Sequence, residues 1–184
     1  MHYIDKMVAW FGNFPVFFLS FFFGVNMKTY VSTYAKYNNG SLKGSWVDLT
    51  QFSDYSEFLE YCIELHSDEH QPELMFQDFE GPEGLYSESD LSEVYDYLDA
   101  LDCSNMDEDA FKAGYELDIP LESIADAYYG QYRNDEDFAY EYAEQAGLIP
   151  ENQWPLNCID WHQAARELMY DFTKNNGYYF YRNY

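Results

Sequence analysis

The sequence predicts an α+β protein composed of about three small modules. Residues with strand-like alternation lie near both ends of the chain, whereas helical periodicity fills the middle. The chain shows no internal repeat and no low-complexity linker. We therefore expect an N-terminal α+β module over residues 27–85, a central helical module over 86–128 and a C-terminal α+β module over 129–184.

The N-terminal module is predicted to begin with a β-hairpin. Residues 29–35 alternate as a strand, and the sequence Asn-Asn-Gly at 38–40 is a strong turn signal. Residues 43–49 then return as the second strand.

One helix and one further strand are predicted to complete this module. Ser53 is a suitable N-cap for a helix that runs to about Leu65. The apolar run at 74–76, with Phe79, indicates a strand that ends at Gly81.

The central module is predicted to start with an amphipathic helix whose N-cap is Ser89. Apolar residues repeat along this helix with the spacing of one face. They are Leu91, Val94, Tyr95, Leu98 and Leu101. Carboxylates occupy the opposite half and rise by about 4.5 Å from one to the next, because they are three residues apart. They are Asp90, Glu93, Asp96 and Asp99.

Further helices are predicted at 107–117 and from Pro120 through Tyr128, with Gly130 ending the second. Asn134 or Asp135 is expected to cap the next helix, which Gly147 stops. Residues 159–168 form the last helical stretch. A closing hairpin is predicted from strands at 169–173 and 178–181, joined by Asn-Asn-Gly at 175–177.

The first 26 residues differ in composition from the rest. Residues 8–25 are almost entirely apolar, and eighteen helical residues would rise about 27 Å, close to the thickness of a bilayer's hydrocarbon core. A membrane anchor or secretory signal is one interpretation. Gly12 and Pro15 weaken a spanning helix, and no small-residue cleavage site follows. We expect instead that translation starts at Met27 and that residues 1–26 lie outside the functional unit.

Charge is the dominant property of the chain. Thirty-four Asp and Glu stand against nine Lys and Arg, so the formal net charge is 9 − 34 = −25. The 68 residues between Lys43 and Lys112 contain twenty carboxylates and no Lys or Arg. Direct nucleic-acid binding is excluded, because phosphate contacts need clustered basic residues. Disorder is excluded too, because the aromatic content is 21%. Such an excess suggests that the charge serves a partner, although acidic halophilic proteins show comparable excesses.

Catalytic and metal-binding patterns are weak. His66 and His70 have helical zinc-ligand spacing, but Ser67 follows His66 where HExxH would require Glu, so we interpret both as solvated surface histidines. Acidic runs at 107–109 and 135–137 lack the ligand spacing of a calcium loop and suit helix N-termini. A nucleophile at Cys158 with His162 rests only on i, i+4 spacing. We therefore expect no enzyme activity, no cofactor and no metal.

The net charge is of the right size to imitate DNA. Duplex DNA carries one charge per roughly 1.7 Å of axis, so a charge of −25 corresponds to about 43 Å of duplex. On a compact globule this charge would be about threefold too dilute per unit area. We therefore expect an elongated molecule with carboxylates gathered along one long face.

From Met27 onward the chain resembles the ArdA antirestriction proteins of conjugative plasmids and transposons. Four spaced motifs carry the resemblance. They are Tyr37-Asn38-Asn39-Gly40 with Leu42, Gly44 and Trp46; Asp78-Phe79-Glu80-Gly81; Tyr128, Gly130 and Tyr132 with Asp137-Phe138-Ala139; and Ile159-Asp160-Trp161 with Ala165-Arg166-Glu167.

The resemblance implies an elongated, cytoplasmic homodimer that imitates bent B-form DNA. Such a protein occupies the DNA groove of type I restriction-modification enzymes, blocking cleavage and often methylation. It implies neither enzyme activity nor a cofactor. Gly40 and Gly177 would then serve hairpin turns, and Trp46, Phe138 and Trp161 the core. The candidate partner-binding carboxylates are Asp78, Glu80, Glu88, Asp90, Glu93, Asp96, Asp99, Asp102, Asp107, Glu108, Asp109, Glu116, Asp118, Glu122, Asp126, Asp135, Glu136, Asp137, Glu141 and Glu144.

Three other readings stay open at this stage. The chain could be an acidic calcium- or metal-binding protein, or an acidic interaction protein anchored to a membrane by residues 8–25. It could also be a DNA mimic directed at another DNA-binding protein. For a dimer interface, the aromatic-rich end at 170–184 is the candidate.

Overall fold

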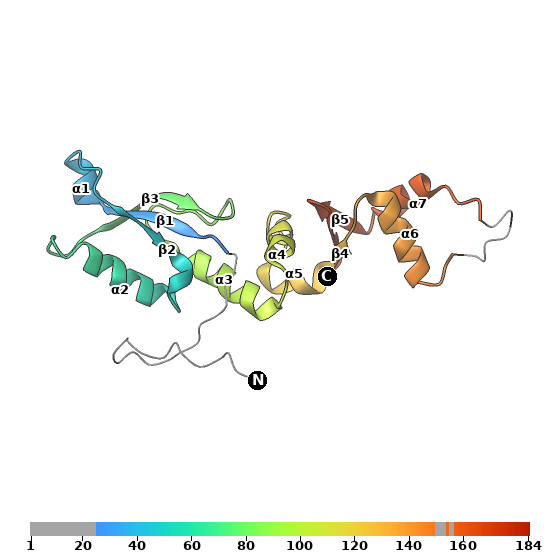
Figure 1. Ribbon diagram of the computed structural model, residues 1–184, viewed down its shortest axis with the longest axis horizontal. Coiled ribbons are helices and arrows are strands. Elements are labelled where there is room, and N and C mark those ends of the chain that lie inside the picture. Colours follow the sequence, from blue (N-terminus) through green and yellow to red (C-terminus); the bar gives the residue numbers. More distant parts are fainter. Residues whose placement is uncertain (1–24, 150–153, 155–156) are drawn as a thin grey trace, which may run out of the picture.

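A computed structural model of the chain describes residues 25–149, 154 and 157–184. The molecule is elongated: one small sheet lies toward one end, helices follow in the middle, and the second sheet lies between these and the last two helices, which lie toward the other end (Figure 1). Both sheets are antiparallel and three-stranded, which confirms the predicted α+β class. The interpretations of residues 8–25 as an anchor or signal, and of residues 1–26 as untranslated sequence, lie outside the described residues except at positions 25 and 26. The division into modules 27–85, 86–128 and 129–184 stays a prediction.

The N-terminal sheet has the strand order β2-β1-β3. Its strands are β1 (Lys28–Thr33), β2 (Ser45–Asp48) and β3 (Leu74–Glu80). All three strands were predicted, but the tight turn predicted at residues 38–40 between the first two was wrong. The chain instead forms a short helix, α1 (Tyr34–Asn38), because the Thr33 hydroxyl accepts a hydrogen bond from the amide of Lys36 and so caps a helical turn.

Helix α2 (Tyr55–Leu65) follows a 3-10 turn, η1 (Leu49–Gln51). The predicted N-cap was one residue too early. Asp54 caps the helix through its carboxylate, which accepts from the Glu57 amide over 2.9 Å. The Glu57 carboxylate in turn accepts hydrogen bonds from the amide and the hydroxyl of Ser53, the residue before the N-cap.

Helix α3 (Ser92–Ser104) begins two residues later than the Ser89 cap predicted. Leu91 stands at the N-cap position and is fully buried, while Asp90 accepts from the Ser92 amide over 2.9 Å. The local hydrogen bonding of Asp90 therefore competes with helix at this point, and burial of Leu91 fixes where the helix starts.

Helix α4 (Glu108–Tyr115), capped by Asp107, matches the prediction. A 3-10 turn, η2 (Leu121–Ser123), and the short helix α5 (Ile124–Ala127) come next. The prediction of helix through Tyr128 was wrong at its end. Tyr128–Gln131 form strand β4, because they pair with a strand from the C-terminus of the chain.

The C-terminal sheet has the order β4-β6-β5. Strands β5 (Phe172–Asn175) and β6 (Tyr178–Tyr181) form the predicted hairpin, and both turn residues, Asn176 and Gly177, have positive φ. Helix α6 (Asp135–Gln145) is capped by Asn134 as predicted. Helix α7 (Trp161–Leu168) is capped by Asp160.

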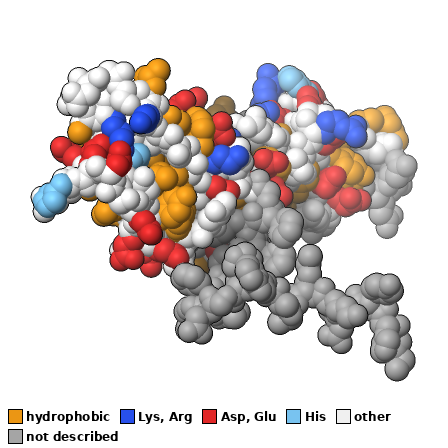
Figure 2. Space-filling model, turned by 60° about the vertical axis from the view of Figure 1, so that its left-hand side comes forward, with side chains coloured by type: hydrophobic (Ala, Val, Ile, Leu, Met, Phe, Trp, Pro, Cys, Tyr) orange, Lys and Arg blue, Asp and Glu red, His pale blue; other side chains and the backbone are white. Residues whose placement is uncertain are grey.

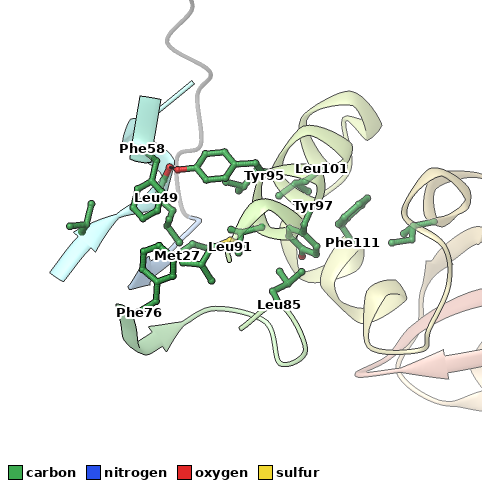
Figure 3. Packing of buried hydrophobic residues seen from close by; sticks show 14 of the residues in the cluster. Met27, Leu49, Phe58, Phe76, Leu85, Leu91, Tyr95, Tyr97, Leu101 and Phe111 are labelled. Carbon is green, nitrogen blue, oxygen red and sulfur yellow. Dashed lines mark hydrogen bonds between the residues drawn. The ribbon is translucent and has the colours of Figure 1, made fainter. Parts of the chain in front are cut away.

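Buried residues form two hydrophobic cores. The first runs from Met27 under the N-terminal sheet, along α2 to α5, to Phe180 on β6. Figure 3 shows the part of it that joins the N-terminal strands to α3 and α4, where the Tyr95 hydroxyl donates to the Leu49 carbonyl over 3.2 Å. The second core is small and centres on Phe138, Phe172 and Tyr179.

The three aromatic residues that the resemblance assigned to the core differ in exposure. Phe138 is fully buried, as expected. Trp46 is 45% exposed and contacts Tyr30 edge to face, so its assignment to the core was wrong. Strand β2 is an edge strand of only four residues, which leaves Trp46 on the outside. Trp161 is half-buried and packs edge to face against Tyr140.

Candidate acidic interaction surface

The twenty candidate carboxylates all reach the surface. Sixteen are exposed and none is buried; the remaining four are half-buried. These four are Glu108, Asp135, Glu136 and Asp137. Burying a charge without a partner is costly, so this placement is what a chain with few cations requires.

Helix α3 carries the most regular row of carboxylates. Its inward face buries Val94, Tyr95, Tyr97, Leu98 and Leu101. On the outside Glu93, Asp96, Asp99 and Asp102 are all exposed, and the described residues include no Lys or Arg paired with any of them. Three-residue spacing makes this row continuous along the helix.

The start of α4 holds a second group of carboxylates. Asp107 caps the helix through hydrogen bonds from the amides of Asp109 and Ala110. The pKa of Glu108 is raised by burial and by the neighbouring charges of Asp109 and Asp107, against the opposing effect of Lys112. The repulsion among these three carboxylates is partly offset by their attraction to the positive end of the helix dipole.

Tyrosines show where carboxylates of different elements converge. The pKa of Tyr115 is raised by burial and by the charges of Glu93 on α3 and Asp118 beyond α4. That of Tyr178, on β6, is raised by burial and by the charges of Asp107 and Asp109. Carboxylates of α3 and of the segment after α4 therefore lie near Tyr115, and those at the start of α4 lie near Tyr178 of the C-terminal sheet.

On α6, part of the acidic run stabilises the fold. Asp135 accepts hydrogen bonds from Lys174 and from the Tyr179 hydroxyl, and its pKa is lowered because these bonds outweigh its partial burial. Glu136 pairs with His162 Nδ1 over 3.0 Å. Glu141 and Glu144, further along the helix, are exposed and have no Lys or Arg partner among the described residues.

Within the described part of the chain, three lysines are paired with carboxylates. Lys36 contacts Asp68 at 2.9 Å and Glu69 at 3.3 Å, Lys112 approaches Glu116 at 3.9 Å, and Lys174 contacts Asp135. On the face seen in Figure 2, Lys and Arg side chains lie among those of Asp and Glu. An unbroken acidic ribbon is therefore not a feature of this face, and its existence on another face stays a prediction.

A cleft lies between elements from three parts of the chain. It encloses about 810 Å³ and is lined by Glu83, Tyr115 to Leu121, Lys174 and Asn175, among others. Glu83 is absent from the twenty candidates, although it is exposed and stands in the longest interval without Lys or Arg. Its position in that interval is the sequence signal by which Glu83 could have been added to the candidates.

The weak catalytic and metal patterns gain no support. The described residues contain no group of three or more His, Cys, Asp and Glu able to hold a metal ion. His66 is 3% exposed rather than solvated, and its Nδ1 lies 2.8 Å from Lys36 Nζ. His162 pairs with Glu136, while Cys158 contacts Asn157. No helix within the described part of the chain is long and apolar enough to span a membrane.

Comparison with protein families decides the identity. The family model described as antirestriction protein (ArdA) matches residues 29–180. The chain belongs to the ArdA family of antirestriction proteins. ArdA proteins are non-enzymatic inhibitors that target restriction-modification enzymes. A search of curated proteins gave no match.

Proposed function

We propose that this ArdA protein inhibits type I restriction-modification enzymes as a mimic of B-form DNA. Its carboxylates take the place of DNA phosphates in the groove of the methyltransferase core and block restriction and, through the same groove, modification. The observation that carries the proposal is the exposed row of four unpaired carboxylates on α3, within an elongated molecule.

The physical basis is the chemistry of the partner. A DNA-binding groove lined with Lys and Arg gains affinity by neutralising phosphates. A folded protein with exposed carboxylates offers the same sign of charge without a base to methylate or a bond to cleave. The net charge of −25 also attracts a basic groove over long range and speeds association.

The site comprises many carboxylates with small individual contributions. Of the twenty candidates, Asp107 and Asp135 also serve the fold, because one caps α4 and the other holds Lys174 and Tyr179. Substitution of either would combine loss of charge with loss of structure. The row on α3 has no such second role and is the better place to test charge alone.

A competition assay tests the proposal. A type I methyltransferase core is offered labelled cognate duplex with increasing amounts of the protein. Mimicry predicts complete displacement of duplex, with no ternary complex at any concentration. A ternary complex that keeps full duplex affinity would contradict it and would indicate a target outside the groove.

The same assay addresses the other candidate targets. An unrelated DNA-binding protein, such as a nucleoid protein, is offered duplex under identical conditions. We expect displacement from the methyltransferase core at concentrations well below those needed for the unrelated protein. Equal potency on both would favour a general DNA mimic over an inhibitor directed at restriction enzymes.

A further inference from the structure

Strand β6 separates the two hydrophobic cores. Phe180 belongs to the first core, with α3, α4 and α5, whereas Tyr179 belongs to the second, with α6. Adjacent residues of a strand point to opposite faces, so one strand holds the central helices on one side and α6 on the other. The relative placement of their carboxylates therefore depends on how this sheet packs.

Helix α4 approaches the sheet closely at Gly114. A Cβ atom built there would lie 2.7 Å from Ile124 Cγ2 and 3.1 Å from Phe180 Cε1. Ile124 and Phe180 are both completely buried, so neither can swing away into solvent. Any larger side chain at 114 must push α4, α5 and β6 apart.

Asn175 on β5 forms hydrogen bonds with the C-terminal part of α4, close to Gly114. Its Nδ2 donates to Glu116 Oε2 over 2.7 Å and lies 3.4 Å from the carbonyl of Ala113. The preceding residue, Lys174, reaches Asp135 at the start of α6. Two consecutive residues of β5 thus connect the sheet to α4 and to α6.

We propose that Gly114 and Asn175 are positioning residues that set the angle between α4 and the C-terminal sheet. Neither residue is charged, yet together they fix the spacing between the carboxylates of α3 and α4 and those of α6. A basic groove built for a regular double helix tolerates a change in that spacing less well than the loss of one charge. The functional part of this inference rests on the proposed DNA mimicry.

The native cysteines allow a direct measurement of the angle. Cys103 near the end of α3 and Cys158, three residues before α7, are exposed free thiols, and the C-terminal sheet lies between α3 and α7 (Figure 1). Cys62 is buried, and burial raises its pKa to about 12, so it stays unreactive. Spin labels on the full chain, diluted with unlabelled protein so that two labelled protomers rarely meet in one dimer, therefore report the distance between Cys103 and Cys158 within one protomer by double electron-electron resonance.

The test compares Gly114→Ala and Asn175→Ala with two controls. Asn39→Ala removes an amide hydrogen bond to the Ala35 carbonyl at the far end of the molecule. Glu116→Gln removes a charge but keeps an acceptor for Asn175. We expect Gly114→Ala and Asn175→Ala each to shift or broaden the distance and to weaken inhibition about fivefold, which corresponds to about 1 kcal/mol of binding free energy. Both controls should keep the distance, and Asn39→Ala should keep full inhibition.

An unchanged Cys103–Cys158 distance in both Gly114→Ala and Asn175→Ala would overturn the proposal. Weaker inhibition at an unchanged distance would overturn it too. If circular dichroism shows that Gly114→Ala does not fold, Asn175→Ala decides alone, because it removes only the two hydrogen bonds of a half-buried side chain. Failure of the proposed DNA mimicry would be recognised independently, because the unmodified protein would then not displace duplex, whatever the Cys103–Cys158 distances are.

Discussion

Phe180 and Tyr179 are neighbours on β6, yet each is buried in a different hydrophobic core. The first core extends to Met27 and the N-terminal sheet, and the second holds α6 and the C-terminal hairpin. Because one strand serves both cores, loosening one is expected to loosen the other.

Replacement of Phe180 by Ala should therefore destabilise the whole molecule, by roughly 3–5 kcal/mol, as for other buried aromatic residues. Urea unfolding is followed in two variants that keep a single tryptophan, Trp46 near one end or Trp161 near the other. Both probes should report the same lowered midpoint. Tyr170→Ala, which removes a side chain that is 80% exposed, is the control and should change stability little. Separate transitions for the two probes would show that the cores unfold independently.

Neutralising the α3 row should weaken inhibition in steps. Glu93→Gln, Asp96→Asn, Asp99→Asn and Asp102→Asn are introduced one after another, and inhibition of the methyltransferase core is titrated. Each step should raise the half-inhibitory concentration about two- to threefold, because each removes one exposed charge worth about 0.5 kcal/mol. A single substitution that abolished inhibition would indicate a discrete site rather than a distributed one.

The matched control for that series changes the same number of charges elsewhere. Glu60→Gln, Glu64→Gln, Glu73→Gln and Asp171→Asn remove four exposed carboxylates that lie outside the twenty candidates. This variant should retain most of its inhibition. Equal losses in the two quadruple variants would mean that net charge alone matters and that the placement of α3 does not.

His66 should make the protein less stable as the pH falls. Burial and the positive charge of Lys36 lower its pKa, and Nδ1 must stay unprotonated to accept from Lys36 Nζ at 2.8 Å. The unfolded chain therefore binds a proton more readily, so stability is lost as the pH falls below the ordinary histidine value of about 6.5. Urea unfolding from pH 7.5 to 5 should show this loss. His66→Gln keeps an acceptor without titrating, and the same slope in that variant would assign it to other groups.

Glu108 should make the protein less stable as the pH rises. Its pKa is raised by burial and by the charges of Asp109 and Asp107, so the folded state binds the proton more tightly than the unfolded state. Its contribution to stability falls as the pH rises through the interval between the ordinary and the raised pKa. Glu108→Gln should therefore stabilise the protein at pH 7 by roughly 0.2–0.5 kcal/mol, the size of a relieved like-charge contact. A destabilised variant would show that the Glu108 carboxylate makes a favourable contact that outweighs the repulsion.

Sequence reasoning succeeded where the signal is local. The apolar spacing from Val94 to Leu101, the helix that starts at the acidic run 107–109 and the turn at Asn176 and Gly177 each depend on residues close in the chain. It failed at Tyr128–Gln131, which reads as a helix end but pairs with β6, about fifty residues later. Only tertiary pairing decides that segment.

In the candidate site, too, local features could be predicted from the sequence, whereas contacts between distant residues could not. A surface position for the carboxylates follows from their charge, and sixteen of the twenty are exposed while the other four are half-buried. Burial of His66 was not predicted, because its partner Lys36 is thirty residues away. The pairing of Asn175 with Glu116, fifty-nine residues apart, has no sequence signal either. What the sequence conveys is which residues carry charge; how they are spaced depends on contacts between distant segments.

The most direct test of DNA mimicry is the salt dependence of binding to the methyltransferase core. Dissociation constants of the labelled protein are measured between 50 and 200 mM salt, beside those of cognate duplex. We expect affinity for the protein to fall by about tenfold over this range, less steeply than for duplex, because a protein surface condenses fewer counterions than DNA. An affinity that does not change with salt would contradict the account, since it would mean that the carboxylates do not substitute for phosphates.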